Sequence, residues 1–291
     1  MDTVESRERL QSIRGVRVSL IFLGFLAACG TSAQSPQLRL YEFDCGRLAY
    51  DSPEAAGFGV SDEETSVREL FVPCYLIEHP DGLFLWDGGL ASALADEEGW
   101  VGTNTSRRRL DRTLADQMAD LGLTLDSLTF VAFSHMHFDH VGVANEITGG
   151  TLLIQEREFE AAFAEDIQVP GFDPSLYEGL MGLERVLLNG DYDVFGDGRV
   201  RILSLPGHTP GHQALYVALN DQGPVVLSGD LYHFRVSREK RIVPAFNVDA
   251  EETLSSMDRM EAFLSETGSA LWIEHDLARY GEGAQAGGYH H

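Results

Sequence analysis

Histidines and aspartates stand at the ends of four apolar segments of this chain, and both residue types bind metal ions. The densest group is SHMHFDH at 134–140, directly after the apolar run 128–133. Three later apolar runs, 202–205, 225–227 and 272–273, lead into the same residue types. The candidate ligands are His135, His137, Asp139, His140, His208, Asp230 and His275. Because strand ends can meet at one edge of a fold built from sheets, we expect these side chains to converge.

The number and type of these ligands predict a site for two metal ions. Zinc binds imidazole nitrogen and carboxylate oxygen, and catalytic zinc sites keep one position open for water. Alone, His208 or His275 would be typical of an ordinary core or loop histidine, and Asp230 of a turn. The prediction therefore rests on their combination with residues 135–140. We expect two Zn²⁺ per chain, although the same ligands accept manganese, iron or cobalt.

The hydrophobic pattern predicts the elements that position these ligands. Runs typical of strands are 38–43, 71–78, 83–86, 128–133, 200–205, 214–219, 225–227 and 270–273. Helical spacing is found at 107–121, 156–164, 174–183 and 251–264. Strands come in consecutive groups with helices outside them, which indicates two packed sheets flanked by helices in an α/β fold. We expect a single hydrolase domain at 38–280 and a loose, glycine-rich tail at 281–291, without ligands in the tail.

The charge of the chain excludes one class of partner. The 291 residues include 46 acidic and 21 basic side chains, which gives a net charge of −25. Because such an acidic surface repels the phosphate backbone of nucleic acids, we expect no nucleic acid as substrate or partner. A small molecule is the expected partner.

The first 37 residues have the pattern of an export signal. Arg14 and Arg17 precede the apolar run 18–28, which is too short to span a bilayer and typical of a signal peptide. Small residues before Cys29 resemble a bacterial lipobox. We therefore expect a signal peptide at 1–28, a lipid anchor on Cys29 as the first mature residue, a tether to residue 37 and a periplasmic location. An uncleaved anchor, or cleavage after Ala33, is the alternative.

Two further cysteines, Cys45 and Cys74, lie in apolar segments with strand character. An exported protein could pair them. Their apolar surroundings favour two buried free thiols instead. Neither has a CxxC partner, so neither is expected to bind zinc.

The ligand pattern resembles that of the metallo-β-lactamase superfamily. HMHFDH at 135–140 is similar to its HxHxDH motif, and the later ligands follow in the same order. The resemblance covers about residues 38–276 and implies a four-layer αββα sandwich. It also implies two ligand groups, namely His135, His137 and His208 for one ion, and Asp139, His140 and His275 for the other, with Asp230 as the bridge.

Within the superfamily, four segments resemble the quorum-quenching N-acyl homoserine lactonases: 72–90, 206–217, 228–234 and 243–261. This resemblance implies a dinuclear zinc hydrolase that opens the lactone ring by attack of a hydroxide shared by both ions. Asp230 weighs against β-lactamase activity, since those enzymes typically carry cysteine or serine there. Acidity weighs against the nuclease branches, and export against the glyoxalase II type. A broader lactonase, esterase or thioesterase remains an alternative, as does a metal-binding lipoprotein without catalysis.

The resemblance also suggests the catalytic groups. Asp139 and Asp230 would neutralise the metal charge and orient or shuttle a proton. Related lactonases carry a tyrosine three positions after the bridging aspartate, where this chain has His233, with Tyr232 one residue earlier. Either His233 or Tyr232 could therefore assist the lactone oxygens. Candidates for an apolar substrate pocket are Phe138, residues 159–172 and the loop at Phe234.

Overall fold

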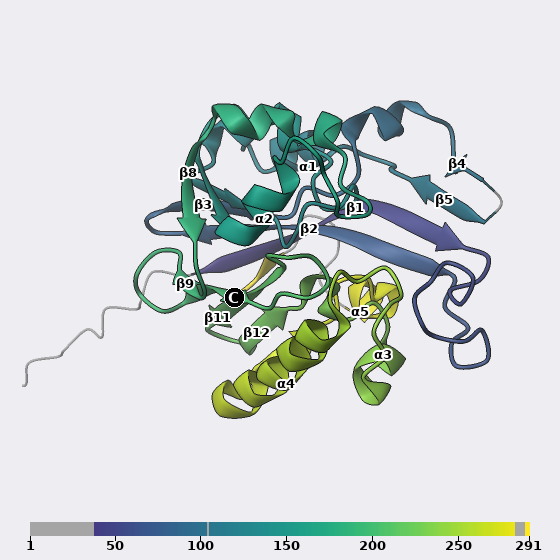
Figure 1. Ribbon diagram of the computed structural model, residues 1–291. Coiled ribbons are helices and arrows are strands. Elements are labelled where there is room, and N and C mark those ends of the chain that lie inside the picture. Colours follow the sequence, from purple (N-terminus) through teal and green to yellow (C-terminus); the bar gives the residue numbers. More distant parts are fainter. Residues whose placement is uncertain (1–37, 104, 283–288) are drawn as a thin grey trace, which may run out of the picture. The chain divides into compact units, whose positions relative to one another are not determined.

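The computed structural model describes residues 38–103, 105–282 and 289–291, which all belong to one compact unit. Two β-sheets pack face to face within it (Figure 1). In the described residues the larger sheet has nine strands, in the order β4 (Val101–Gly102), β5 (Ser106–Arg109), β1 (Arg39–Tyr50), β2 (Glu69–His79), β3 (Gly82–Trp86), β6 (Phe130–Ala132), β7 (Thr151–Gln155) and β8 (Glu184–Leu188), with β14 (Tyr289–His290) beside β1. The predicted signal peptide, Cys29 and the tether lie outside the described residues.

The smaller sheet contains five strands within the same part of the chain. Their order is β13 (Ala270–Trp272), β12 (Gly223–Leu227), β11 (Gln213–Leu219), β10 (Val200–Ser204) and β9 (Tyr192–Asp193). Helices α1 (Leu114–Asp120) and α2 (Glu156–Ala162) lie on the outer side of the larger sheet, and α4 (Ala250–Thr267) lies on the outer side of the smaller one (Figure 1). The shorter helices are α3 (Arg235–Lys240) and α5 (Leu277–Glu282). The predicted αββα sandwich is confirmed.

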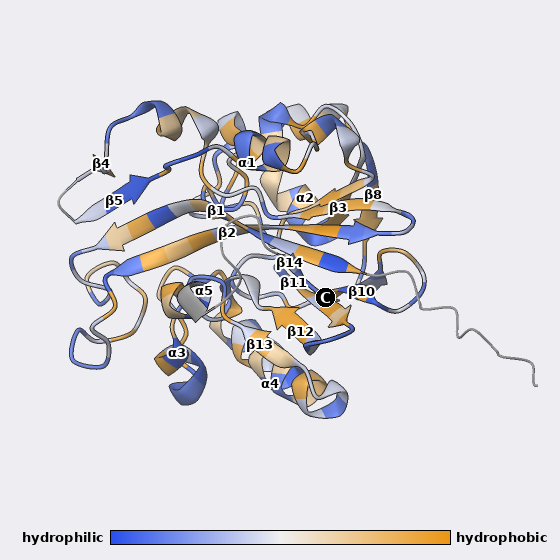
Figure 2. Ribbon diagram, turned by 180° about the vertical axis from the view of Figure 1, so that it is seen from behind, coloured by the Kyte–Doolittle hydropathy of each residue, from blue (hydrophilic) through white to orange (hydrophobic). Residues whose placement is uncertain are grey.

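Alternating side chains explain why the larger sheet is covered on both faces, because successive residues of a strand point to opposite sides. Tyr41 of β1 and Leu76 of β2 pack with residues of α1 and α2, whereas Leu40 and Ile77 pack against the smaller sheet. The smaller sheet is also apolar on both faces, and Met260 of α4 belongs to its outer cluster. In Figure 2, β10 and β12 are largely orange, while α4 carries both orange and blue residues.

Most predicted elements are present, but one predicted helix is shorter than expected and another is not an α-helix. The segment 107–121 divides into β5 and α1, because residues 106–109 pair with β1 and the Thr113 side chain caps α1 by accepting from Asp116 N. The segment 174–183 forms two short 3-10 turns, Pro174–Leu176 and Glu178–Gly182. None of the helices in the described ranges is both long and apolar enough to cross a bilayer.

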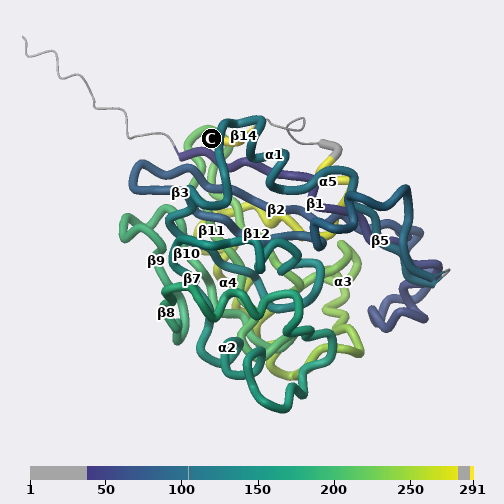
Figure 3. Tube along the Cα trace, turned by 90° about the horizontal axis from the view of Figure 1, so that it is seen from above, coloured from purple at the N-terminus to yellow at the C-terminus, as the bar shows by residue number. Residues whose placement is uncertain are grey.

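The last described residues are attached to the larger sheet. β14 pairs with the start of β1, with His290 opposite Leu40 (Figure 3). His290 is buried, and its Nδ1 lies 3.0 Å from Oε1 of Gln222. The expectation of a loose tail is therefore wrong for residues 289–291, because the pairing with β1 could not be read from a glycine-rich composition.

Cys45 and Cys74 form a disulfide, so the expectation of two free thiols is wrong. They lie on the adjacent strands β1 and β2, with Cα atoms 5.7 Å apart. Their side chains point to the same face of the sheet, where both are buried. The register of the two strands, which is not visible in the spacing of the cysteines, brings the thiols together.

Reduction of this disulfide should lower the free energy of unfolding by about 2–4 kcal/mol, because the bond closes a loop and restricts the unfolded chain. The two cysteines are 29 residues apart. Urea denaturation with and without a thiol reductant measures the effect. A Cys45→Ala/Cys74→Ala variant is the control and should not respond to the reductant. Equal stability of the oxidised and fully reduced wild type would contradict the expectation.

Candidate metal centre

The seven predicted ligands come together from the ends of four strands. The segment 134–140 follows β6, and His208 lies beyond the end of β10. Asp230 lies in the 3-10 turn Gly229–Leu231 after β12, and His275 follows β13. All seven side chains are buried except that of His137, which is partly buried. The structure therefore brings together every residue that the sequence assigned to the metal site.

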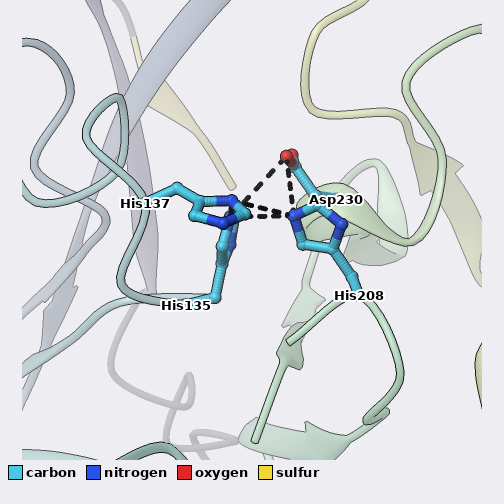
Figure 4. A group of neighbouring side chains, drawn as sticks. All are labelled: His135, His137, His208 and Asp230. Atoms are coloured by element: carbon cyan, nitrogen blue, oxygen red, sulfur yellow. Dashed lines mark hydrogen bonds and ion pairs between the residues drawn. The ribbon is translucent and has the colours of Figure 1, made fainter. Parts of the chain in front are cut away.

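The first ligand group consists of three histidines and one oxygen of Asp230 (Figure 4). The His135 Nε2 lies 2.8 Å from His137 Nδ1, and the His208 Nε2 lies 3.1 Å from each of these atoms. The Oδ2 of Asp230 is 3.6 Å from His135 Nε2 and 3.4 Å from His208 Nε2. Three nitrogen atoms and one oxygen atom thus surround a common point.

The second group consists of Asp139, His140 and His275, and it faces the other oxygen of Asp230. The Oδ2 of Asp139 lies 3.9 Å from His140 Nε2 and 3.8 Å from His275 Nε2. The Oδ1 of Asp230 lies 3.4 Å from His140 Nε2 and 2.9 Å from His275 Nε2. One carboxylate therefore presents one oxygen to each group, which is the arrangement of a bridging ligand.

The second ring nitrogen of each ligand histidine is hydrogen-bonded to an oxygen atom. The His208 Nδ1 donates to Oδ1 of Asn247 at 2.9 Å, and the His275 Nδ1 donates to the carbonyl of Phe71 at 2.7 Å. The remaining contacts are His135 Nδ1 with Ser134 Oγ, His137 Nε2 with the carbonyl of Pro170, and His140 Nδ1 with Asp87 Oδ2. Carbonyl and carboxylate oxygens accept only, so the opposite ring nitrogen keeps its lone pair for a metal.

The charges and the free atoms of the site fit metal ions. The buried His140 Nε2 and Asp230 Oδ1 make no hydrogen bond of normal geometry among the described residues, although Asp230 Oδ1 lies 2.9 Å from His275 Nε2. Burial lowers the pKa of His135 and of His208, which keeps both rings neutral, as metal binding requires. Burial also disfavours the charged form of His140, but the carboxylates of Asp230, Asp87 and Asp139 outweigh it and raise the pKa of His140. The negative charges of these carboxylates favour positive charge at the site, and bound divalent cations would balance them.

Asp87 supports the site, although the sequence analysis did not identify it. It follows β3, its Oδ2 accepts from His140 Nδ1 at 3.1 Å, and its Oδ1 accepts from the backbone N–H of Ser134 at 2.6 Å. Asp87 thereby fixes both the ring of one ligand and the start of the loop that carries four. The signal was present: Asp87 is a polar residue directly after an apolar strand, like the ligands themselves.

Two further buried side chains hold the ligand loops together. The His212 Nδ1 donates to the carbonyl of Leu205 at 2.9 Å, and its Nε2 accepts from the backbone N–H of Asp230 at 2.9 Å. His212 therefore joins the end of the segment after β10 to the turn that carries Asp230. Glu158 of α2 accepts from the backbone N–H groups of Met136 and Gly211, and burial raises its pKa to about 7.

The structure separates the two candidate helpers that follow Asp230. The Nε2 of His233 lies 3.0 Å from Oδ2 of Asp230, and the ring lines the cavity beside the ligands. The ring of Tyr232 is buried in the cluster between the smaller sheet and α4, where its hydroxyl donates to Glu261. Tyr232 is therefore not a residue of the site. Its side chain points to the opposite side of the chain from that of His233, as adjacent extended residues do.

Comparison with known proteins agrees with this geometry. A family model described as the metallo-beta-lactamase superfamily matches residues 67–267. The chain therefore belongs to the metallo-β-lactamase superfamily, which confirms the resemblance seen in its motifs.

Several named relatives belong to one branch. The N-acyl homoserine lactonase AttM of Azorhizobium caulinodans is 31% identical over 231 residues, covering 76% of this chain and 88% of that protein. The N-acyl homoserine lactonase of Bacillus thuringiensis is 29% identical over 247 residues, covering 82% and 93%. An N-acyl homoserine lactone hydrolase solved with N-hexanoyl-L-homoserine at its catalytic metal centre gives a TM-score of 0.74 at 25% identity, covering 88% of this chain and 100% of that chain. The dizinc lactonase AidC, with a TM-score of 0.60 at 17% identity over 83% and 88%, shows the fold alone.

Replacement of the shared carboxylate should empty the site. Asp230→Asn removes the negative charge that both groups share and replaces one of the two ligand oxygens by an NH2 group, so most bound metal should be lost after dialysis. His208→Ala removes a ligand from the first group only and should lose less metal. Plasma mass spectrometry of metal per chain measures both effects. The control is His291→Ala, which lies outside both ligand groups. A wild-type metal content in Asp230→Asn would contradict the assignment of Asp230 as the bridge.

Proposed function

We propose that this protein is a dinuclear zinc hydrolase that opens the lactone ring of N-acyl homoserine lactones. The observation that supports a dinuclear site most directly is the position of the Asp230 carboxylate. It presents one oxygen to each of two ligand groups at the floor of an apolar cavity. The named lactonases among its relatives support this choice of substrate.

The cavity has the character that an acyl lactone requires. Its volume is about 230 Å³, and its floor is formed by His137, Asp139, Asp230, His233 and His275. The walls are mostly apolar: Leu48, Ala56, Phe58, Leu70, Phe138, Pro170 and Phe246. Of the pocket candidates from the sequence, Phe138 and residues 170–171 line this cavity, while Phe234 packs behind Phe58 with ring centroids 5.2 Å apart. An acyl homoserine lactone would fit this arrangement of polar and apolar residues, with its lactone ring over the polar floor and its acyl chain along the apolar walls.

The chain's own residues would position the reactants. When bound, two zinc ions supply a hydroxide at neutral pH and positive charge beside the ester carbonyl. Asp139 and Asp230 balance that charge and can accept a hydrogen bond from the attacking water. His233 Nε2 lies 3.0 Å from Asp230 Oδ2, and the ring lines the same cavity, where it can hydrogen-bond to an oxygen of the substrate. The apolar walls exclude other water from the reacting group.

A substrate panel tests this proposal. Zinc-loaded protein is assayed with acyl homoserine lactones of several chain lengths, δ-lactones, aryl esters, a thioester and nitrocefin. We expect the highest kcat/KM for acyl homoserine lactones and no hydrolysis of nitrocefin. A chelator should abolish activity, zinc should restore it, and Asp230→Asn serves as the inactive control. A higher kcat/KM on aryl esters or thioesters than on every lactone would contradict the lactonase assignment. No hydrolysis of any substrate would favour a metal-binding protein without catalysis.

We also propose that the protein is exported and anchored to a bacterial membrane through Cys29. The disulfide between Cys45 and Cys74 supports an oxidising compartment, because such bonds are rare in the cytosol. Cells that express the full chain should incorporate labelled palmitate into the protein, and Cys29→Ser should abolish the label. Unlabelled wild-type protein in the cytosolic fraction would count against this location.

A further inference from the structure

The cavity contains a hydroxyl group that no part of the proposed mechanism has used so far. Among the residues that line it, Tyr50 is the one with a hydroxyl side chain. Tyr50 is the last residue of β1, and Leu48, two positions earlier on the same face of that strand, lines the cavity as well. The direction of β1 therefore carries Tyr50 to the mouth of the metal centre.

The contacts of Tyr50 hold its ring in place. Its backbone N–H donates to the carbonyl of Arg68 at 2.9 Å, and it pairs with Ser106 of β5. Its ring meets that of Phe58 edge to face, with centroids 5.0 Å apart. Two strands and an aromatic neighbour thus limit the directions that the phenol can take, as required of a group that must meet a substrate atom.

The surroundings of the phenol suit a hydrogen-bond donor. Burial raises the pKa of Tyr50, and the charges of Asp139 and Asp230 raise it further, so the hydroxyl stays protonated at neutral pH. The Ser106 side chain lowers this pKa by hydrogen bonding, but burial and the two carboxylates outweigh that effect. A protonated phenol in the lining of the cavity can donate to a substrate oxygen.

We propose that the Tyr50 hydroxyl donates a hydrogen bond to an oxygen of the scissile ester group and is a catalytic residue of this enzyme. The inference rests on the proposed hydrolase function. In the reaction, the oxygen of hydroxide bonds to the carbonyl carbon and the bond from that carbon to the ring oxygen breaks. The proton that the hydroxide brought passes to the ring oxygen, so the product is a carboxylate and an alcohol. Tyr50 keeps its own proton throughout and stabilises the negative charge that develops on the ester oxygen.

The test is Tyr50→Phe, which removes the hydroxyl and keeps the ring that packs on Phe58. We expect kcat/KM for acyl homoserine lactones to fall by about tenfold to a hundredfold, mainly through kcat, because one preorganised donor to the reacting oxygen is lost. Zinc content and thermal stability should stay at the wild-type level. Calorimetry should show weaker binding of the ring-opened product to the zinc-loaded variant. The matched control is Tyr232→Phe, which removes a hydroxyl outside the cavity and should leave kcat and KM within about twofold.

A second substrate identifies the oxygen. If Tyr50 contacts the carbonyl oxygen, Tyr50→Phe should lose activity on lactones and aryl esters alike. If it contacts the ring oxygen, only lactones should be affected, because an aryloxide leaves without help. Unchanged kinetics and product affinity in Tyr50→Phe would overturn the inference while leaving the lactonase proposal intact. If the wild-type protein hydrolyses aryl esters but no lactone, the role of Tyr50 is tested by comparing the wild type with Tyr50→Phe on aryl esters. If the wild type hydrolyses neither lactones nor aryl esters, both proposals are wrong.

Discussion

The structure depends on how a buried, negatively charged carboxylate is held between two groups of histidines. Asp230 is almost fully buried, and Asp139 and Asp87 lie close to the same rings. Carboxylates in such a place are costly unless cations or donors compensate them. Cations between the ligand groups would provide that compensation, and every ligand ring is already oriented by an oxygen on its far side. Binding energy would then come from charge balance, with little rearrangement of the chain.

Rigid supports surround this charge. The ligands follow strands of both sheets, and each ligand group takes residues from both, so the packing of the two sheets sets the distances within each group. Glu158 joins the loop that follows β6 to the loop that follows β10 through two backbone N–H groups. His212 fixes the backbone at Asp230 in the same way. The apolar core between the sheets therefore acts on the site directly, because any shift of one sheet against the other would move the ligands that follow β6 relative to those that follow β10, β12 and β13.

Local signals in the sequence identified the candidate metal ligands, the strands before them and the fold class. The features that were missed depend on contacts between distant segments. Nothing near Tyr50 marks it as a residue of the site, because the pairing of β1 with β5 and the ring of Phe58 place it there. The pairing of Cys45 with Cys74 likewise follows from strand register. Tyr232 was one of two alternatives for the site, because related lactonases carry a tyrosine one position later, but neighbours in an extended segment face opposite ways.

The disulfide has a further consequence, since it lies directly under the loop that carries Asp87. A Cβ atom on Gly89 would lie 2.2 Å from Cβ of Cys45 and 3.0 Å from Sγ of Cys74, so the loop rests on the bridge itself. The backbone N–H of Leu90 also donates to the carbonyl of Cys45 at 3.1 Å. Whether the Cys45–Cys74 disulfide is oxidised or reduced should therefore affect the position of Asp87, which holds the ring of His140. Protein made in a reducing cytoplasm, or stored with thiols, would be a chemically different catalyst from the oxidised form.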